Sequence, residues 1–314
     1  MDLAAPIFND EAAARAHLEA IRWPHGPACP HCGVVGNAVR LAGEAHRDGL
    51  LKCRACSRQF SVTIGTVMER SHLPLHKWVA GFHLMAASKK GMSAHQLHRT
   101  LKVTYKTAWF MAHRVREAMR EANPSPIGGE GKVIEADEAY LGKAENAVAV
   151  KKRYTAPTKG GRSGPAGKRP IVALVERGGE VRAVHMPQAT AKNVRNLLVK
   201  NASRKSRLHT DESRLYPPVG AEFAKHETVK HSAGEYARGD VTTNSVEGFF
   251  GIFKRGMRGV YQHCGEQHLQ RYLDEFAFRY NHRVKLGVDD AARAALAVKG
   301  AGGKRLTYQQ PRRA

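Results

Sequence analysis

Acidic residues are scarce in this 314-residue sequence. It holds 28 aspartates and glutamates against 51 lysines and arginines, so its formal net charge at pH 7 is +23. A charge excess of this size repels itself unless a counter-charge binds, which makes a polyanion the first partner to expect. The alternative, a basic surface that is merely solvated, leaves that repulsion without compensation.

Long apolar runs are also missing. A helix that spans a bilayer needs about 20 predominantly apolar residues, whereas the longest helical candidate, 78–87, is interrupted by His83. The amino terminus, 1–6, lacks the basic start and the apolar core of a signal peptide. We therefore expect an intracellular protein of the bacterial cytoplasm, associated with the nucleoid, whose partner is DNA and not a membrane.

Cysteine is rare, but its placement is informative. Four of the five cysteines form two Cys-x-x-Cys pairs, Cys29 with Cys32 and Cys53 with Cys56. This spacing is typical of a zinc site, in which two tight turns place four thiolates on one metal. Since four thiolates complete the tetrahedron, the sequence predicts one structural Zn²⁺. Two disulfides or free thiols are the alternative, and disulfides are rare in the cytosol. Cys264 has no paired spacing and is expected to be an ordinary thiol.

Helical periodicity extends from residue 74 to residue 121, after a lead-in helix expected at 10–22. The pattern predicts a helix at 76–89, a second from Ser93 with a capping-box pattern, and a third from residue 105. Two short helices with a tight turn and a basic second helix are typical of a helix-turn-helix. A plain helical hairpin with solvated charges is the alternative. The positions predicted to be exposed and available to DNA are Tyr105, Lys106, Thr107, His113, Arg114 and Arg116.

A cluster of helix breakers at 123–129 marks the clearest domain boundary. The mostly apolar run at 133–143 predicts a strand covered on both faces, with Asp137 at its centre. A buried carboxylate needs a partner, which is either a basic side chain in the core or a bound metal. This stretch alone does not decide between them.

The chain beyond this strand alternates between strands and helices. Residues 151–170 hold seven basic residues and no acid, and predict a mobile loop that is either a DNA-binding arm or a solvated insertion. A hairpin is expected at 170–186, a helix at 189–201, and further strands at 207–212 and 227–230. This order predicts a mixed α/β domain.

A long helix is expected to begin at Thr243. Glu247, Lys254 and Arg258 share one stripe of it, which could bring a carboxylate and two bases to a phosphate backbone. Asn244, with Glu247 three residues later, also resembles a capping box, in which the glutamate needs no further function.

Three acids, Asp137, Asp211 and Glu247, thus stand on two strands and a late helix. Such a triad can hold two divalent cations, one that activates a water or a 3′ hydroxyl and one that stabilises the departing oxygen. Carboxylate oxygens suit Mg²⁺, for which Mn²⁺ is a natural substitute.

Several motifs together resemble the ISXO-type insertion-sequence transposases of the DDE superfamily. Behind the zinc ribbon they are EADEAYLGK at 135–143, HTDE at 209–212, TNSVEGFFGIFKRG at 243–256 and RYLDEFAFRYN at 271–281. Their order is specific, and the resemblance covers nearly the whole chain. It implies a ribonuclease H-like catalytic domain that cleaves DNA at the ends of a mobile element and transfers the 3′ hydroxyl into target DNA.

The resemblance also implies roles for single residues. Asp137 and Asp211 become metal ligands. Members of the group carry either glutamate or asparagine in the third place, and of Glu247 and Asn244 we favour Glu247, because an anionic oxygen binds a hard cation better. Lys254 is the base that the family pattern places two turns later, and we expect it to contact the DNA backbone near the metals.

Other expectations concern the neighbours and the assembly. Glu138 is expected to be dispensable for catalysis, and Arg258 to contact DNA. Handling two element ends at once implies a homo-oligomer on DNA. Two other functions stay open, namely a non-catalytic DNA-binding regulator and a domesticated ribonuclease H-like nuclease. The expected parts are a lead-in helix at 1–25, a zinc ribbon at 26–62, a helix-turn-helix-like region at 63–123, a linker at 124–132, a catalytic domain at 133–290 and a basic tail at 291–314.

Overall fold

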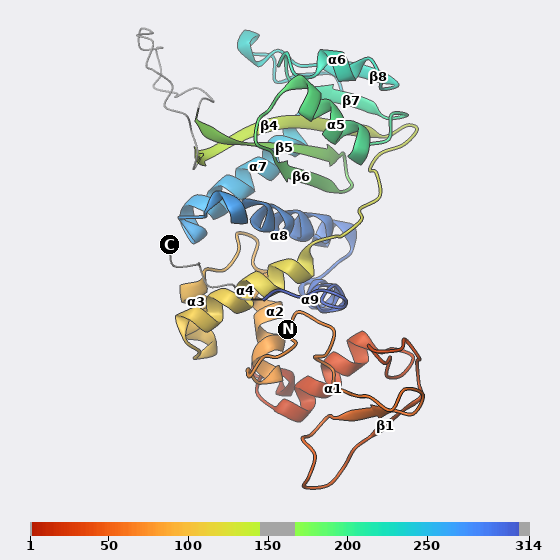
Figure 1. The fold of residues 1–314 in the computed structure, drawn as a ribbon. Helices are drawn as coiled ribbons and strands as arrows, with labels where there is room; N and C mark the ends of the chain where they lie inside the picture. The colour runs from red at the N-terminus through yellow and green to blue at the C-terminus, as the bar shows by residue number, and fades with distance from the viewer. Residues whose placement is uncertain (1, 145–166, 308–314) are drawn as a thin grey trace, which may run out of the picture. The chain divides into compact units, whose positions relative to one another are not determined.

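The computed structural model describes residues 2–144 and 167–307, which divide into two compact units (Figure 1). Unit 1 takes its residues from both sides of unit 2 in the chain, and unit 2 is the continuous stretch 122–281. Most of the loop predicted at 151–170 lies outside the described residues, and its last three residues belong to a strand. Within the described part, no helix is both long and apolar enough to cross a membrane.

A small antiparallel sheet carries the paired cysteines of unit 1. Its strands, in spatial order, are β1 (Ala38–Arg40), β2 (Leu51–Cys53) and β3 (Gln59–Phe60). The predicted lead-in helix is α1 (Glu11–Arg22), which follows a 3-10 turn, η1 (Pro6–Phe8). Trp23 ends α1 and packs edge-on against Phe60, with 5.7 Å between the ring centroids. The helix is thereby joined to the sheet.

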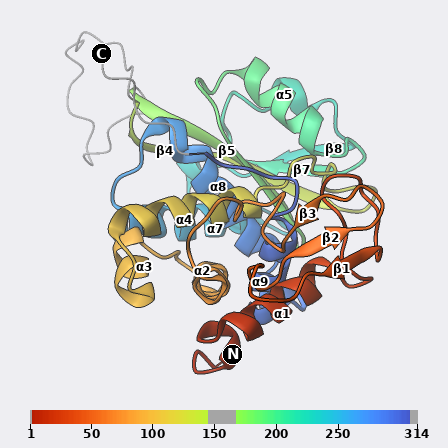
Figure 2. The same cartoon turned by 60° about the horizontal axis from the view of Figure 1, so that its bottom comes forward.

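Among the described residues, unit 1 contains four further α-helices (Figure 2). Helix α2 lies against α4 and α9, and α3 lies against α4. The Ser93 side chain caps α3 by accepting a hydrogen bond from the N–H of Gln96 (3.1 Å), as the capping pattern predicted. The helices are α2 (Leu75–Ala87), α3 (Ala94–Leu101), α4 (Tyr105–Met119) and α9 (Asp290–Lys299).

Helix α4 is more deeply buried than its sequence predicted. The exposure expected for His113, Arg114 and Arg116 is wrong, because their exposed fractions are 1%, 9% and 2%. The helix packs against α2, α3 and α9, so more than one stripe of its surface is covered. Its first three residues, 105–107, are at least partly exposed.

The prediction of a basic tail at 291–314 is wrong for the part of this segment that the structure describes. Helix α9 occupies much of it and buries apolar side chains against α2. Arg293 is buried with them and donates to the carbonyl oxygen of Ala86 (3.2 Å). Beyond α9, the carbonyl oxygen of Leu306 accepts from Arg114 Nε (3.3 Å). The end of the segment lies outside the described residues.

Unit 2 is built on a five-stranded mixed sheet. The first three strands in spatial order pair antiparallel, and the last two continue parallel to β4. In that order the strands are β6 (Val181–His185), β5 (Lys168–Glu176), β4 (Val133–Lys143), β7 (Arg207–Thr210) and β8 (Lys225–Thr228).

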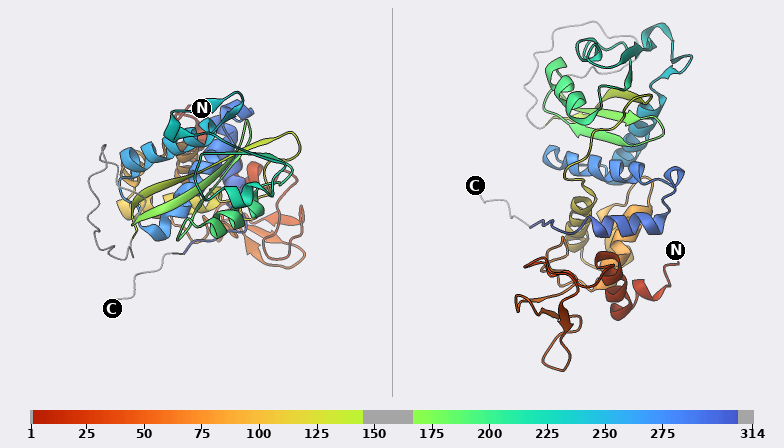
Figure 3. Two further views of the ribbon diagram at one scale, coloured as in Figure 1. Left: turned by 90° about the horizontal axis from the view of Figure 1, so that it is seen from above. Right: turned by 90° about the vertical axis from the view of Figure 1, so that its right-hand side faces the viewer.

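Helices cover both faces of this sheet (Figure 3). On one face, the phenylalanines of α7 (Asn244–Gly256) and α8 (Leu269–Asn281) pack on Ala139, Ile171 and Ala173. On the other face, α5 and α6 pack on side chains that alternate with these. The result is the predicted α/β architecture in three layers. The remaining elements are α5 (Ala191–Asn201), α6 (Pro217–Gly220), η2 (His231–Ala233), β9 (Ala237–Arg238), β10 (Val241–Thr242), a π-helical turn (Met257–Tyr261), η4 (Glu266–His268) and, in unit 1, η5 (Val284–Leu286).

Candidate active site

Asp137 and Asp211 meet at one edge of the central strands. The parallel strands β4 and β7 pair Glu135 with His209, so the residues two positions further along each strand emerge on the same side. Oxygens of Asp137, Asp211 and Glu138 all lie within 4.8 Å of one another. The topology of the sheet therefore brings together two acids that are far apart in the sequence.

Glu138 belongs to this cluster, although the sequence analysis set it aside. Its two oxygens accept hydrogen bonds from Ser213 Oγ (2.9 Å) and from the hydroxyl of Tyr216 (2.6 Å). Tyr216 is fully buried. The carboxylate is therefore held in place by two hydroxyl donors of the segment after β7. Its dispensability for catalysis remains a prediction.

The cluster is electrostatically unfavourable without a cation. Burial, followed by the charges of Glu138 and Asp211, raises the pKa of Asp137 to about 7. Burial also raises the pKa of Asp211 and of Glu138. Within the described residues, none of the three carboxylates forms an ion pair with a lysine or an arginine. The alternative of a salt-bridged core aspartate is thus not supported, and an oxygen-ligated cation fits the donor set.

Glu247 approaches this cluster from α7. It lies outside the group of closely spaced oxygens, but its charge raises the pKa of both Asp137 and Asp211. Its side chain is 45% exposed. Thr243 Oγ1 donates to Glu247 Oε1 (2.7 Å), and His231 Nε2 lies 3.5 Å from the same oxygen.

The capping box considered for Asn244 and Glu247 does not form. Thr243 occupies the cap position and makes no side-chain capping bond. Asn244 is exposed, and its N–H donates to Thr242 Oγ1 (3.1 Å). The first N–H groups of α7 are satisfied from elsewhere.

Glu135 supplies that cap from strand β4. Its carboxylate is fully buried and accepts from the N–H groups of Ser245 (2.6 Å) and Val246 (3.2 Å). The same carboxylate accepts from Arg177 Nε (2.9 Å), and Arg177 Nη2 lies 3.3 Å from His209 Nδ1. A carboxylate at a helix N-terminus is favoured by the helix dipole. Glu135 therefore joins the strand of Asp137, the strand of Asp211 and the helix of Glu247.

We expect Glu135→Ala to destabilise unit 2 by about 3 kcal/mol, because it leaves Arg177 without its buried partner and α7 without its cap. Urea denaturation followed by circular dichroism measures this. The matched control is Glu222→Ala, which removes ion pairs with Arg195 and Arg204, whose side chains are 47% and 57% exposed, and is expected to cost less than about 1 kcal/mol. Equal costs for the two variants would contradict the capping role.

Glu212 organises the segment that faces α7. Its carboxylate accepts from the N–H groups of His231 (2.7 Å) and Ser232 (2.9 Å). The hydrogen bond from Ser232 is the main reason that the pKa of Glu212 falls to about 2. His231 is thereby placed beside both Asp211 and Glu247.

Lys254 and Arg258 follow Glu247 along the same side of the helix. Lys254 is partly exposed, and its Nζ lies 5.7 Å from the centroid of the Phe250 ring. Arg258 is exposed and lies in the π-helical turn that ends α7. Both remain available to a phosphate backbone.

The four paired cysteines converge in unit 1. Their sulfur atoms lie within 4.8 Å of one another, with Cys29 and Cys56 3.7 Å apart and Cys32 and Cys53 3.6 Å apart. Sulfurs on a tetrahedral zinc, at bonds of about 2.3 Å, stand about 3.8 Å apart. N–H groups, first that of Cys56, lower the pKa of the Cys53 thiol to about 7. At Cys32, a hydrogen bond from Val34 is outweighed by burial and the three neighbouring thiols, so the pKa of this thiol is raised to about 12. A bound cation would therefore be needed to make all four cysteines thiolates. The donor set fits Zn²⁺.

Of the residues predicted to contact DNA in unit 1, three begin α4. Tyr105 is 45% exposed and stacks on His95 with 4.4 Å between the ring centroids. Lys106 is exposed and Thr107 partly so. Arg114 instead lies in the wall of a cavity, with its Nη1 donating to the carbonyl oxygen of Glu69 (3.2 Å).

Two family models match the chain. The ISXO2-like transposase domain matches residues 128–281, and the transposase zinc-ribbon domain matches residues 9–59. The chain belongs to the ISXO2-like transposases. It is an insertion-sequence DNA transposase with a zinc-ribbon domain and an ISXO2-like transposase domain of mixed α/β architecture, as the sequence predicted.

The transposase also resembles individual proteins. It is 29% identical over 280 residues to an uncharacterized protein in transposable element ISH50 of Halobacterium salinarum, covering 87% of this chain and 91% of that one. A solved structure of the Mos1 transposase paired-end complex with the left transposon end matches at 12% identity and a TM-score of 0.29, over 71% of this chain and 74% of that one. The Mos1 strand transfer complex matches at 12% identity and a TM-score of 0.28, over 73% and 79%.

The residues that sequence analysis missed are those that position the site. Glu135 is two residues before Asp137 and therefore lies on the same face of the strand. The alternation of side chains along a strand could have identified it as a neighbour of the site. Arg177 comes directly after β5. It lies beside Glu135 because β5 pairs with β4. Ser213 and Tyr216 lie in a segment without periodic pattern, so nothing local marked them as partners of Glu138.

Proposed function

We propose that this transposase cuts DNA at the ends of its insertion sequence and joins the freed 3′ hydroxyl to target DNA, using Mg²⁺ held by Asp137 and Asp211. The observation that carries the proposal is the cluster of three carboxylates within 4.8 Å, without a lysine or arginine paired to it in the described residues. Two divalent ions, with Mn²⁺ as a substitute, would activate the attacking oxygen and stabilise the departing one.

The residues around the cluster support an in-line displacement on a phosphodiester. Glu247 is the third ligand in this proposal, since its charge already acts on Asp137 and Asp211. Lys254, two turns further along α7, binds the DNA backbone beside the reacting phosphate. Hydrogen bonds from Ser213 and Tyr216 orient Glu138 and prevent it from moving away from the cluster.

Binding of DNA is supported by charge. The formal net charge of +23 and the exposed start of α4 favour a polyanion, with Tyr105, Lys106 and Thr107 contacting the duplex and Arg258 the backbone near the site. We infer that the protein works on chromosomal DNA inside the cell and assembles as a homo-oligomer that holds two ends. Affinity for end DNA should fall steeply with salt.

The direct test is a joining reaction. A supercoiled target plasmid and short duplexes with the terminal repeats that flank the gene are incubated with the protein and Mg²⁺, and the products are sequenced. Nicks at the repeat ends and joined plasmids support the proposal. Cleavage without joining would identify a nuclease, and binding without either reaction would identify a DNA-binding regulator.

The third ligand can be decided in the same assay. We expect Glu247→Gln to lower cleavage by roughly a hundredfold or more, because it removes an anionic ligand, and Asn244→Ala to lower it by less than about threefold. Affinity for end DNA should be unchanged in both variants, which separates a ligand from a binding residue. The reverse order of the two losses would make Asn244 the third catalytic residue.

A further inference from the structure

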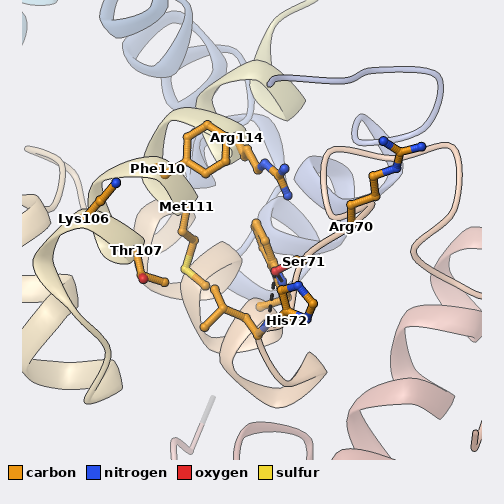
Figure 4. Close-up of a pocket in the computed structure, with 10 residues that line it drawn as sticks. Arg70, Ser71, His72, Lys106, Thr107, Phe110, Met111 and Arg114 are labelled. Atoms are coloured by element: carbon orange, nitrogen blue, oxygen red, sulfur yellow. Dashed lines mark hydrogen bonds between the residues drawn. The ribbon is translucent and has the colours of Figure 1, made fainter. Parts of the chain in front are cut away.

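A cavity of about 420 Å³ opens in unit 1 between the start of α4 and the segment that precedes α2 (Figure 4). Its size is within the range of about 300–1,000 Å³ that is usual for small-molecule sites. In Figure 4 the side chains from α4 and those from residues 70–72 lie on opposite sides of it. The lining residues are Arg70, Ser71, His72, Leu73, Trp78, Lys106, Thr107, Phe110, Met111 and Arg114.

The floor of this cavity is apolar and fixed. Trp78 and Met111 are each 1% exposed. Trp78 Nε1 donates to Ser71 Oγ (3.2 Å), which ties the segment before α2 to that helix. Phe110 is partly exposed and offers the accessible aromatic ring of the lining. The floor of the cavity is therefore already formed before a ligand binds.

The rim of the cavity is cationic. Arg70 has a side chain that is 78% exposed, and Lys106 is exposed at the start of α4. The guanidinium carbon of Arg114 lies 4.6 Å from the centroid of the Phe110 ring. The ten lining residues include no carboxylate; the nearby Glu69 lies 3.9 Å from Arg70 Nε. An apolar floor beneath three permanent cations suits a ligand with a flat aromatic part and negative charge on either side of it.

We propose that this cavity binds an unstacked nucleobase of the DNA, with its flanking phosphates on Arg70 and Lys106. The base would stack on the part of the Phe110 ring that faces the cavity, beside the Arg114 guanidinium that already contacts this ring, as unpaired bases do on aromatic side chains and arginine planes. Paired bases within a duplex cannot enter such a cavity, whereas strand cutting and joining produce unpaired bases. The proposal rests on the proposed DNA-binding function and adds a site that binds a base exposed when the strands open.

Full-length protein tests this with two fluorescent duplexes of the element end, one fully paired and one with a single unpaired 2-aminopurine. We expect the duplex with the unpaired base to bind roughly fivefold or more tightly, as stacking of one base provides, and the 2-aminopurine emission to be quenched on binding. Phe110→Leu, which keeps an apolar side chain, and Arg70→Asn, which suits the left-handed backbone at φ 56°, should each remove most of this preference.

The matched control is Arg99→Asn, which removes an equal charge from an exposed position of α3 outside the cavity. It should weaken both duplexes alike and leave their ratio unchanged. Equal affinity of the wild type for the two duplexes overturns the cavity proposal alone, whereas failure to bind either duplex overturns the proposed function. A preference that survives Phe110→Leu also overturns the cavity proposal. If Phe110→Leu keeps the preference for the unpaired base but changes the oligomeric state, the cavity proposal is also overturned, because the cavity would then be occupied by a second copy of the chain.

Discussion

Asp137→Asn should reduce cleavage of end DNA by at least roughly a thousandfold and leave the affinity for that DNA unchanged. The side chain keeps its size, but it loses the charge that binds a hard cation. Single-turnover cleavage in Mg²⁺ measures the loss, and fluorescence anisotropy measures binding. Asp48→Asn, at an exposed position of the zinc ribbon, is the matched control and should cleave normally. Normal cleavage by the Asp137 variant would remove the basis of the proposed mechanism.

The same substitution should stabilise the metal-free protein at high pH. The pKa of Asp137 is raised to about 7 in the folded state, against about 3.9 in an unfolded chain. Between pH 4 and pH 7 the folded state thus holds a proton on Asp137 that the unfolded state has lost, so the contribution of Asp137 to the free energy of unfolding falls as pH rises through this window.

Asparagine removes that dependence. At pH 8, without metal, we expect the variant to be more stable than the wild type by on the order of 1–4 kcal/mol. Added Mg²⁺ should close the gap by stabilising the wild type alone. Thermal unfolding at pH 4, 6 and 8, with and without Mg²⁺, measures both effects. A stability difference between variant and wild type that does not grow from pH 4 to pH 8 without metal would contradict the electrostatics of the cluster.

Loss of zinc is the second large effect. Cys53→Ser should release the single bound zinc and unfold the ribbon, because metal binding supplies about 10–16 kcal/mol of apparent folding free energy in comparable structural sites. Mass spectrometry of the native protein measures the metal. Trp23, which packs on Phe60 of the ribbon, should report unfolding as a red shift of tryptophan emission.

Cys264→Ser provides the control for this experiment. Cys264 is buried in unit 2, and its Sγ donates to the carbonyl oxygen of Gly265 (3.2 Å), a bond that a serine hydroxyl can also make. Zinc content and Trp23 emission should stay at their wild-type values. Retention of one zinc by Cys53→Ser, with unchanged emission, would show that three thiolates suffice and that the fourth position is open.

Much of unit 2 could be predicted from local pattern. Apolar runs predicted strands β4, β5 and β6, and a helical stripe predicted α7, because each of these signals depends on residues close together in the sequence. Asp137 and Asp211 could be assigned because each lies at or just beyond a predicted strand. The motif order then supplied the family, which spacing alone could not.

Other features depended on contacts that no local pattern contains. The burial of Arg114 depends on the segment after α9, whose Leu306 accepts a hydrogen bond from it and which follows unit 2 in the chain. The cap on α7 comes from Glu135, on a strand rather than on the helix itself. The place of Glu138 in the cluster depends on Tyr216, which reaches it from a loop.

The packing of α9 on α2 also determines the order in which the two units can fold during synthesis. Unit 2 is continuous in the chain and can fold as soon as it has emerged, whereas the helical core of unit 1 is incomplete until α9 has been made. A nascent chain therefore acquires its carboxylate cluster before the helical core of unit 1 is complete. Premature termination shortly before α9 would yield a polypeptide with the carboxylate cluster but without the completed helical unit that is proposed to engage DNA.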